Sequence, residues 1–197
     1  MSLWIFLRHG ESEANQKRVF SGHQDVALTQ KGEAQAQAAG LTLIETLQGQ
    51  SLSRVLSSDL QRAVRTAKLS LESAAQTQEI HQTTALRERH LGEWQGESID
   101  KLKAQGSRAV LHRWTGHAPG GESLEALAIR SVTYLAGLDE QTTNLLVGHG
   151  GLIRVLLGLL DGEEKATIGR VNIPNAVPIV REVSSGKWAD LLRELTG

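Results

Sequence analysis

Two short apolar segments, each followed directly by a histidine, constrain the fold of this chain most strongly. Leu3–Leu7 precedes Arg8-His9-Gly10, and Asn144–Gly148 precedes His149. Apolar runs of this length that end in glycine or a turn are typical of buried parallel strands. In an open α/β sheet, groups just past the carboxyl ends of the strands face the crevice where ligands bind. Two histidines placed in this way, one of them beside an arginine, predict a site for an anion and for nucleophilic chemistry on it.

The rest of the chain alternates segments with strand and helix patterns. Thr29 predicts the N-cap of a helix that reaches Leu47, and Ser58-Asp59 predicts the cap of a helix through Ala75. Further helices are expected at 122–138 and 152–160, and further strands at 54–57 and, more weakly, 77–81. This alternation predicts an α/β fold, a three-layer α/β/α sandwich around a mostly parallel central sheet.

Two stretches have less regular patterns. Residues 86–121 are polar, contain tryptophans and several glycines, and are expected to form a loop with short helices. Segments 176–183 and 187–195 flank Ser184-Ser185-Gly186, which predicts a closing hairpin. The last segment fits a helix equally well.

Composition limits the classes of partner. The 197 residues suit one domain, 1–197, although length alone also admits two small ones. A net charge of −1 gives no reason to expect nucleic acid or an anionic membrane as a partner, so any cationic site must be local. The absence of cysteine excludes a disulfide framework and a cysteine nucleophile. The apolar run before Arg8 is too short for a signal or membrane segment, and a cytoplasmic location is expected.

His9 is the predicted nucleophile. Imidazole titrates near neutrality, so its neutral form is available to attack phosphorus, and a hydrogen bond to one ring nitrogen would leave the other free. Gly10 lets the backbone approach an anion closely, and Ser12 is expected to cap a short helix that follows. Arg8 and Arg62, the latter in the first turn of its helix, are predicted phosphate contacts because the guanidinium fork suits phosphate oxygens.

Glu88 is the predicted general acid, which protonates the leaving oxygen and later activates water. The assignment rests on spacing, and Glu93 and Glu97 are nearby alternatives. His149 would donate to the phosphoryl oxygens in the transition state. The remaining histidines show no ligand spacing with carboxylates, and no Gly-Lys-Ser/Thr follows His149, so neither a metal nor a cofactor is expected.

Four blocks of the sequence resemble the histidine phosphatase superfamily, and they occur in the family's order. They are residues 8–32 around RHGE, 57–67 (SSDLQRAVRTA), 86–96 (LRERHLGEWQG) and 147–157 (VGHGGLIRVLL). The resemblance implies a phosphoglycerate mutase-like fold, a phosphate pocket made by Arg8, Arg62 and His149, phosphorylation of His9 and proton donation by Glu88. It also implies that Asn15, Ser21 and Gly22 line the pocket, with Arg89 and Glu122-Ser123 nearby.

Within this superfamily the sequence favours a phosphatase over a mutase. Phosphoglycerate mutases carry a substantial insertion after the acid-bearing loop, whereas here only a short stretch separates Gly96 from Pro119, and His23 replaces the mutase tryptophan. A short lid, roughly residues 89–121, shields a phosphohistidine poorly from water. We therefore expect a metal-independent phosphatase of small phosphorylated metabolites.

Several alternatives stay open at this point. A cofactor-dependent phosphoglycerate mutase and a protein phosphohistidine phosphatase both fit the same motifs. His112 and Arg113 could contact a carboxylate or a sugar phosphate, although surface positions explain them better, as for Arg65. The expected partner is a small phosphorylated metabolite, and the sequence is compatible with a homodimer.

Overall fold

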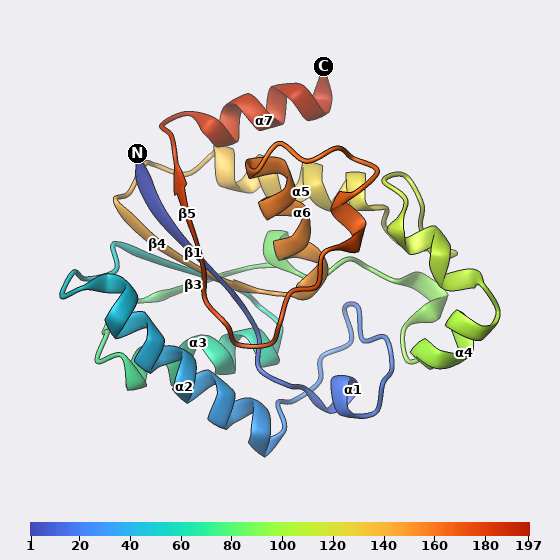
Figure 1. The fold of residues 1–197 in the computed structure, drawn as a ribbon, viewed down its shortest axis with the longest axis horizontal. Coiled ribbons are helices and arrows are strands. Elements are labelled where there is room, and N and C mark those ends of the chain that lie inside the picture. The colour runs from blue at the N-terminus through green and yellow to red at the C-terminus, as the bar shows by residue number, and fades with distance from the viewer.

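The protein is organised around a central five-stranded sheet with helices on both faces (Figure 1). The computed structural model describes residues 1–197. The strands occur in the spatial order β3-β2-β4-β1-β5. Their bounds are β1 (Ser2–Arg8), β2 (Arg54–Ser58), β3 (Ile80–Thr83), β4 (Thr143–Gly148) and β5 (Ile179–Val183). All neighbouring pairs are parallel except β1 with β5, which is antiparallel. The expected mostly parallel sheet is confirmed.

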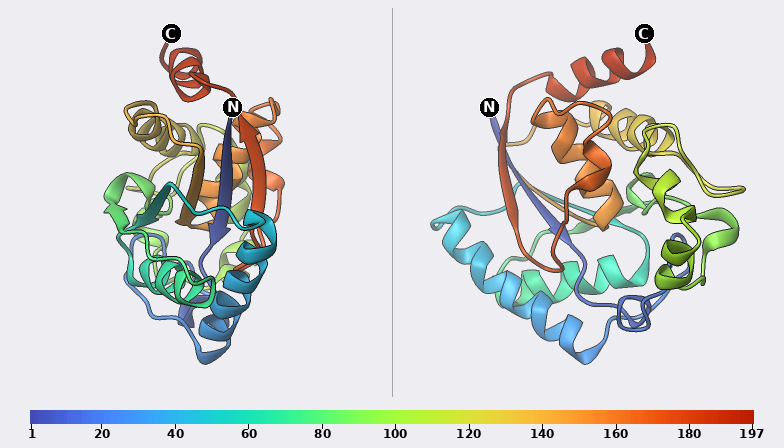
Figure 2. Two further views of the ribbon diagram at one scale, coloured as in Figure 1. Left: turned by 90° about the vertical axis from the view of Figure 1, so that its left-hand side faces the viewer. Right: turned by 45° about the vertical axis from the view of Figure 1, so that its right-hand side comes forward.

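The helices form two outer layers, so the three-layer arrangement is also confirmed. Helices α2 and α3 pack together on one face, and α5 packs against α6 and α7 on the other (Figures 1 and 2). The α-helices are α1 (Glu13–Gln16), α2 (Gln30–Leu47), α3 (Gln61–Ser73), α4 (Ile99–Ala104), α5 (Leu124–Ala136), α6 (Gly150–Leu160) and α7 (Lys187–Thr196). Short 3₁₀ helices are η1 (Thr84–Leu86), η2 (Gly92–Trp94), η3 (Ser107–His112) and η4 (Ile168–Arg170). None of the helices is long and apolar enough to cross a membrane.

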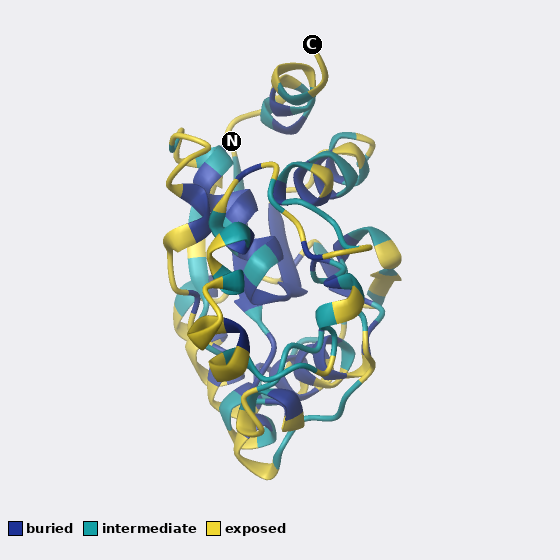
Figure 3. Ribbon diagram, turned by 90° about the vertical axis from the view of Figure 1, so that its right-hand side faces the viewer, coloured by how far each residue is buried: buried dark blue, intermediate teal, exposed yellow.

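Strand alternation sends side chains into a separate core on each face of the sheet. On β1, Ile5 and Leu7 join the core under α2 and α3, while Trp4 and Phe6 join the core under α5, α6 and α7. The central strands are buried on both sides (Figure 3). Burying one such side chain contributes about 1.5–3 kcal/mol to stability. The buried strands β1 and β4 therefore hold His9 and His149, which directly follow them, in defined positions.

Local side-chain caps begin four of the seven α-helices, whereas α3, α6 and α7 start without one. The Thr29 side chain accepts a hydrogen bond from the Gly32 amide at the start of α2, as predicted. The prediction that Ser58-Asp59 caps α3 was wrong, because the N-cap is Leu60, which supplies no side-chain bond. A distant loop residue supplies the carboxylate instead: Asp25 Oδ1 accepts from the Gln61 amide at 2.8 Å.

The predicted C-terminal hairpin was also wrong. Strand β5 pairs antiparallel with β1, and residues after Gly186 form helix α7 rather than a returning strand. Trp188 and Leu191 of α7 are buried against the core next to α5, which gives this amphipathic segment its helical packing partner. The helical alternative for this segment is therefore the correct one.

Candidate functional site

The carboxyl ends of β1 and β4 bring the two histidines together. The strands are neighbours in register, with Arg8 opposite Gly148, and the His9 amide donates to the Gly148 carbonyl at 2.9 Å. The ring centroids of His9 and His149 are 5.3 Å apart, with an interplanar angle of 61°. Both side chains are buried. Two positions separated by 140 residues in sequence thus form one site.

The orientation of the His9 ring is held by its own loop. Its Nδ1 lies 2.7 Å from the Gly10 carbonyl oxygen, so the proton resides on Nδ1 and the lone pair is on Nε2. The Gly10 amide in turn donates to Thr66 Oγ1 at 3.0 Å. A Cβ on Gly10 would lie 2.2 Å from the Gly32 carbonyl oxygen, so this close approach requires glycine. The result is an imidazole whose Nε2 is available as a nucleophile.

Burial keeps both histidines neutral. Desolvation lowers the pKa of His9 well below its ordinary value, and the positive charges of Arg62 and Arg8 lower it further. The pKa of His149 is depressed by the same burial, with Arg62 the leading charge contribution. Because only a neutral imidazole can attack or be phosphorylated, this environment favours the reactive form of His9 at neutral pH.

The arginines are anchored by carbonyls and keep N–H groups free. Arg8 Nη1 donates to the Ile173 carbonyl at 2.6 Å, and Arg62 donates to the Gln24 and Gly22 carbonyls at 2.8 and 2.9 Å. The Nε atoms of both arginines and both ring nitrogens of His149 are buried without a hydrogen-bond partner. Buried polar groups in folded proteins are nearly always paired. The two arginine Nε–H groups and the single N–H of the neutral His149 ring therefore lack an acceptor, which an anion next to His9 would provide.

Glu88 is held at the N-terminus of α6. Its Oε1 accepts from the Arg89 amide at 2.8 Å, and its Oε2 accepts from the Gly151 amide at 2.9 Å. Of the two alternatives for the acid, Glu93 is exposed and Glu97 pairs with Lys101 at 2.7 Å. Glu88 lines the cavity that contains His9, and neither alternative does.

A cavity of about 260 Å³ opens over His9. All of the other predicted catalytic and substrate-binding residues except His149 line it: Arg8, Asn15, Ser21, Gly22, Arg62, Glu88 and Arg89. The His149 ring lies beside His9, outside this lining. Sequence reasoning missed Arg108, Arg154 and Asn172, which also line the cavity. Arg154 is four residues after Gly150 on α6, and this spacing places both residues on one face of the helix, so the sequence could have indicated Arg154. No pattern in the sequence indicates Arg108.

Other residues singled out in the sequence have different positions. His112 lines the cavity, while Arg113 is exposed outside it. Glu122 does not line the cavity; its carboxylate accepts from the His90 amide and from Arg130. Ser123 caps α5, and Arg65 forms a surface ion pair, so the surface interpretation of Arg65 is confirmed.

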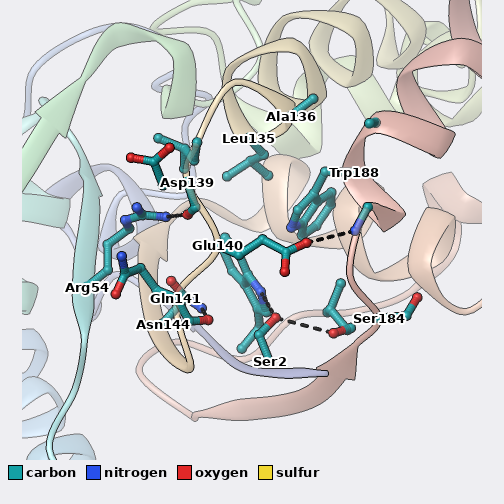
Figure 4. A pocket seen from close by; sticks show the side chains of 15 residues that line it. Ser2, Arg54, Leu135, Ala136, Asp139, Glu140, Gln141, Asn144, Ser184 and Trp188 are labelled. Atoms are coloured by element: carbon teal, nitrogen blue, oxygen red, sulfur yellow. Dashed lines mark hydrogen bonds between the residues drawn. The ribbon is translucent and has the colours of Figure 1, made fainter.

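A second cavity, of about 90 Å³, lies at the opposite end of the sheet (Figure 4). It is formed where β1, β2 and β4 begin, and it contains none of the predicted site residues. Arg54 donates to the Asp139 carbonyl at 2.7 Å and Glu140 accepts from the Gly186 amide at 3.0 Å (Figure 4), whereas Asn144 Oδ1 and Trp188 Nε1 are buried without a hydrogen-bond partner. The cavity over His9 is therefore the candidate active site. No group of three or more His, Cys, Asp or Glu side chains is arranged to hold a metal ion.

A strand-end histidine pair surrounded by arginines suits an anionic group, and the comparison with known families identifies the class of protein. The model of the histidine phosphatase superfamily (branch 1) matches residues 4–194. The chain belongs to this superfamily, as its sequence motifs indicated.

The similar proteins include phosphoglycerate mutases and phosphatases. A 2,3-bisphosphoglycerate-dependent phosphoglycerate mutase of Gloeobacter violaceus is 34% identical over 92% of this chain and 86% of the relative. Among solved structures, a mycobacterial glucosyl-3-phosphoglycerate phosphatase is 31% identical, with a TM-score of 0.79 and coverage of 91% of this chain and 90% of the other. The alpha-ribazole phosphatase of Shigella flexneri is 26% identical, with a TM-score of 0.77 and coverage of 93% and 92%. These structural relatives agree with the prediction of a phosphoric monoester hydrolase.

Proposed function

We propose that this protein is a metal-independent phosphatase that hydrolyses small phosphorylated metabolites through a phosphohistidine at His9. One observation carries the proposal. The unpaired, buried N–H groups of Arg8 and Arg62 and the unpaired His149 ring surround a neutral His9 whose Nε2 is free. Phosphoryl transfer requires mainly positioning and charge neutralisation, which these groups supply.

The reaction has two steps. His9 Nε2 attacks phosphorus, the new P–N bond forms as the P–O ester bond breaks, and Glu88 gives its proton to the leaving oxygen. Water then attacks the phosphohistidine while Glu88 accepts a proton from it, the P–N bond breaks, and inorganic phosphate leaves. The Nδ1–H of His9 donates to the Gly10 carbonyl throughout, and Arg8, Arg62 and His149 stabilise charge on the equatorial oxygens.

The test is phosphate release from a panel of phosphorylated metabolites in the presence of a chelator. Native protein is compared with His9→Ala and with a control, His81→Ala, which changes an exposed histidine on β3. Release should fall by about a thousandfold or more in His9→Ala and stay unchanged in the control. Release that survives His9→Ala would disprove the mechanism.

A phosphoglycerate mutase is the second candidate, favoured by the 34% identity to a protein of that name. The same phosphohistidine would then pass its phosphoryl group to a substrate hydroxyl rather than to water. Interconversion of 2- and 3-phosphoglycerate that depends on 2,3-bisphosphoglycerate and outpaces phosphate release would establish the mutase. The segment between Gly96 and Pro119, which folds as two short helices, supports the phosphatase because it offers little cover against water.

A further inference from the structure

His23 joins two loops that line the candidate active site. Ser21 and Gly22, directly before it, line the cavity over His9 together with Glu88, whereas His23 itself does not. The Nε2 atom of the His23 ring lies 2.7 Å from the backbone carbonyl oxygen of Glu88, 65 residues further along the chain. A carbonyl oxygen only accepts, so Nε2 carries a proton and donates it. No step of the proposed reaction uses this contact.

The contact acts on the peptide group that holds the acid. The carbonyl of Glu88 and the amide of Arg89 belong to one peptide group, which is planar and rigid. Its carbonyl accepts from His23, and its N–H donates to Glu88 Oε1 at 2.8 Å. Fixing the carbonyl therefore fixes the direction of the N–H, and donation to the carbonyl also polarises the amide and strengthens its bond to the carboxylate. The Glu88 carboxylate is thus coupled to His23 through one rigid unit.

The His23 ring is held in place by the acid-bearing loop, residues 86–96. The backbone amide of His23 donates to Gln95 Oε1 at 2.7 Å, and its ring meets the ring of His90 edge-on, with centroids 4.9 Å apart and an interplanar angle of 83°. The Gly92 amide donates to His90 Nδ1 at 3.2 Å, which fixes the second ring. The side chain of His23 is only 23% exposed. A ring fixed in this way loses little further conformational entropy when it donates to the carbonyl.

Two other donors support the same peptide group and carboxylate. Arg130 Nη2 reaches the Glu88 carbonyl at the longer distance of 3.3 Å, and the Gly151 amide donates to Glu88 Oε2 at 2.9 Å. Loss of the His23 side chain would therefore weaken the placement of the carboxylate without abolishing it. This limits the size of the effect that we expect.

We propose that His23 is a positioning residue for Glu88, and that its hydrogen bond to the Glu88 carbonyl aims the acid at the leaving oxygen. This inference rests on the proposed function, in which Glu88 protonates that oxygen. Departure of an alkoxide requires the proton, whereas 4-nitrophenolate leaves readily without it. A positioning residue for the acid should therefore matter for alkyl phosphates and much less for 4-nitrophenyl phosphate.

The test measures kcat/KM for glycerol 3-phosphate, an alkyl phosphate, and for 4-nitrophenyl phosphate. This constant includes the step in which the ester oxygen leaves. Native protein is compared with Glu88→Gln, which removes the acid, with His23→Leu, which removes the donor, and with His23→Gln, whose amide N–H can reach the same carbonyl. The control is His81→Leu, which changes an exposed histidine on β3.

We expect the ratio of kcat/KM for the alkyl substrate to that for the nitrophenyl substrate to fall by about tenfold in His23→Leu, the equivalent of one hydrogen bond. The fall should have the same direction as in Glu88→Gln. His23→Gln should recover most of the native ratio, and His81→Leu should not change it. An equal loss for both substrates in His23→Leu would show that His23 only supports the fold of the site. That result, or a native ratio in His23→Leu, would overturn the proposal.

Hydrogen exchange separates this inference from the proposed hydrolysis. The Arg89 amide, which donates to Glu88 Oε1, is followed by NMR without substrate in native protein, His23→Leu and His23→Gln, with the His9 amide as an internal reference. Exchange of the Arg89 amide should be about tenfold faster in His23→Leu and close to native in His23→Gln. That result supports the coupling even if native protein releases no phosphate. Unchanged exchange in His23→Leu refutes the coupling even if native protein is a phosphatase.

Discussion

Replacing Arg130 with methionine should show how the acid-bearing loop is held in place. Arg130 lies on α5 and donates to both carboxylate oxygens of Glu122 at 2.9 Å and to the Ala85 carbonyl at 2.8 Å. Longer bonds of 3.2–3.4 Å reach other carbonyls within residues 84–88. One guanidinium thus ties the segment that ends in Glu88 to a helix of the core.

The expected cost follows from these contacts. Hydrogen bonds to a charged group contribute about 1.5–3 kcal/mol each, and the side chains of Arg130 and Glu122 are 24% and 23% exposed, which reduces that value. Methionine replaces the hydrocarbon stem but leaves the partly buried Glu122 carboxylate without its cationic partner, with only the His90 amide still donating to it. We expect the free energy of unfolding to fall by about 2–3 kcal/mol, or the Tm by roughly 5–10 °C for a chain of this size.

The assay is urea unfolding at pH 7, with Arg181→Met as the matched control. Arg181 forms two hydrogen bonds of 2.8 and 2.9 Å with Asp161, but these side chains are 38% and 36% exposed, so that loss should cost less than ~1 kcal/mol. Equal costs for the two variants would refute the reasoning. The double variant Arg130→Met/Glu122→Gln should be more stable than Arg130→Met alone, because it removes a partly buried carboxylate charge that no longer has a cationic partner. In Arg130→Met, kcat should fall by about tenfold while the KM changes less, since Glu88 loses its support.

Two further predictions concern the site itself. Burial lowers the pKa of His9 and His149, so these histidines stay neutral in the folded protein at a pH near 6.5, where the unfolded chain already binds protons. The free energy of unfolding should therefore be constant above that pH and fall as the pH decreases below it. The expected decrease is up to ~1.4 kcal/mol per pH unit for each histidine. Urea unfolding at pH 7.5 and 5.5 checks this, and a His149→Gln variant with the same pH dependence as native protein would contradict it. A Cβ at Gly151 would lie 2.2 Å from Glu88 Oε1, so Gly151→Ala should displace the carboxylate and lower kcat at least tenfold. Gly137→Ala, whose Cβ would have ordinary contacts of 3.6 Å, should keep native kcat; unchanged kcat in Gly151→Ala would argue against Glu88 as the acid.

Local sequence was sufficient for the elements whose formation depends on near neighbours. The apolar runs that end at Arg8 and Gly148 predicted β1 and β4, because a strand buried on both faces requires uninterrupted apolar residues. Thr29 predicted the start of α2, because an N-cap acts within three residues. Four sequence blocks in the family's order, two of which contain His9 and His149, indicated the family.

Tertiary structure decided everything that depends on partners distant in sequence. The C-terminal segment pairs its strand with β1 rather than with itself, and α3 takes its capping carboxylate from Asp25, neither of which a local pattern contains. The same holds for the charge of the site. Arg154 follows Gly150 by one helical turn, but nothing in the sequence indicates Arg108; η3 and α6 both contact η4, and this arrangement places the two arginines in one cavity. Sequence determines which groups a chain carries and which short segments form, whereas long-range packing determines which of those groups meet and which charges stay without an ion-pair partner.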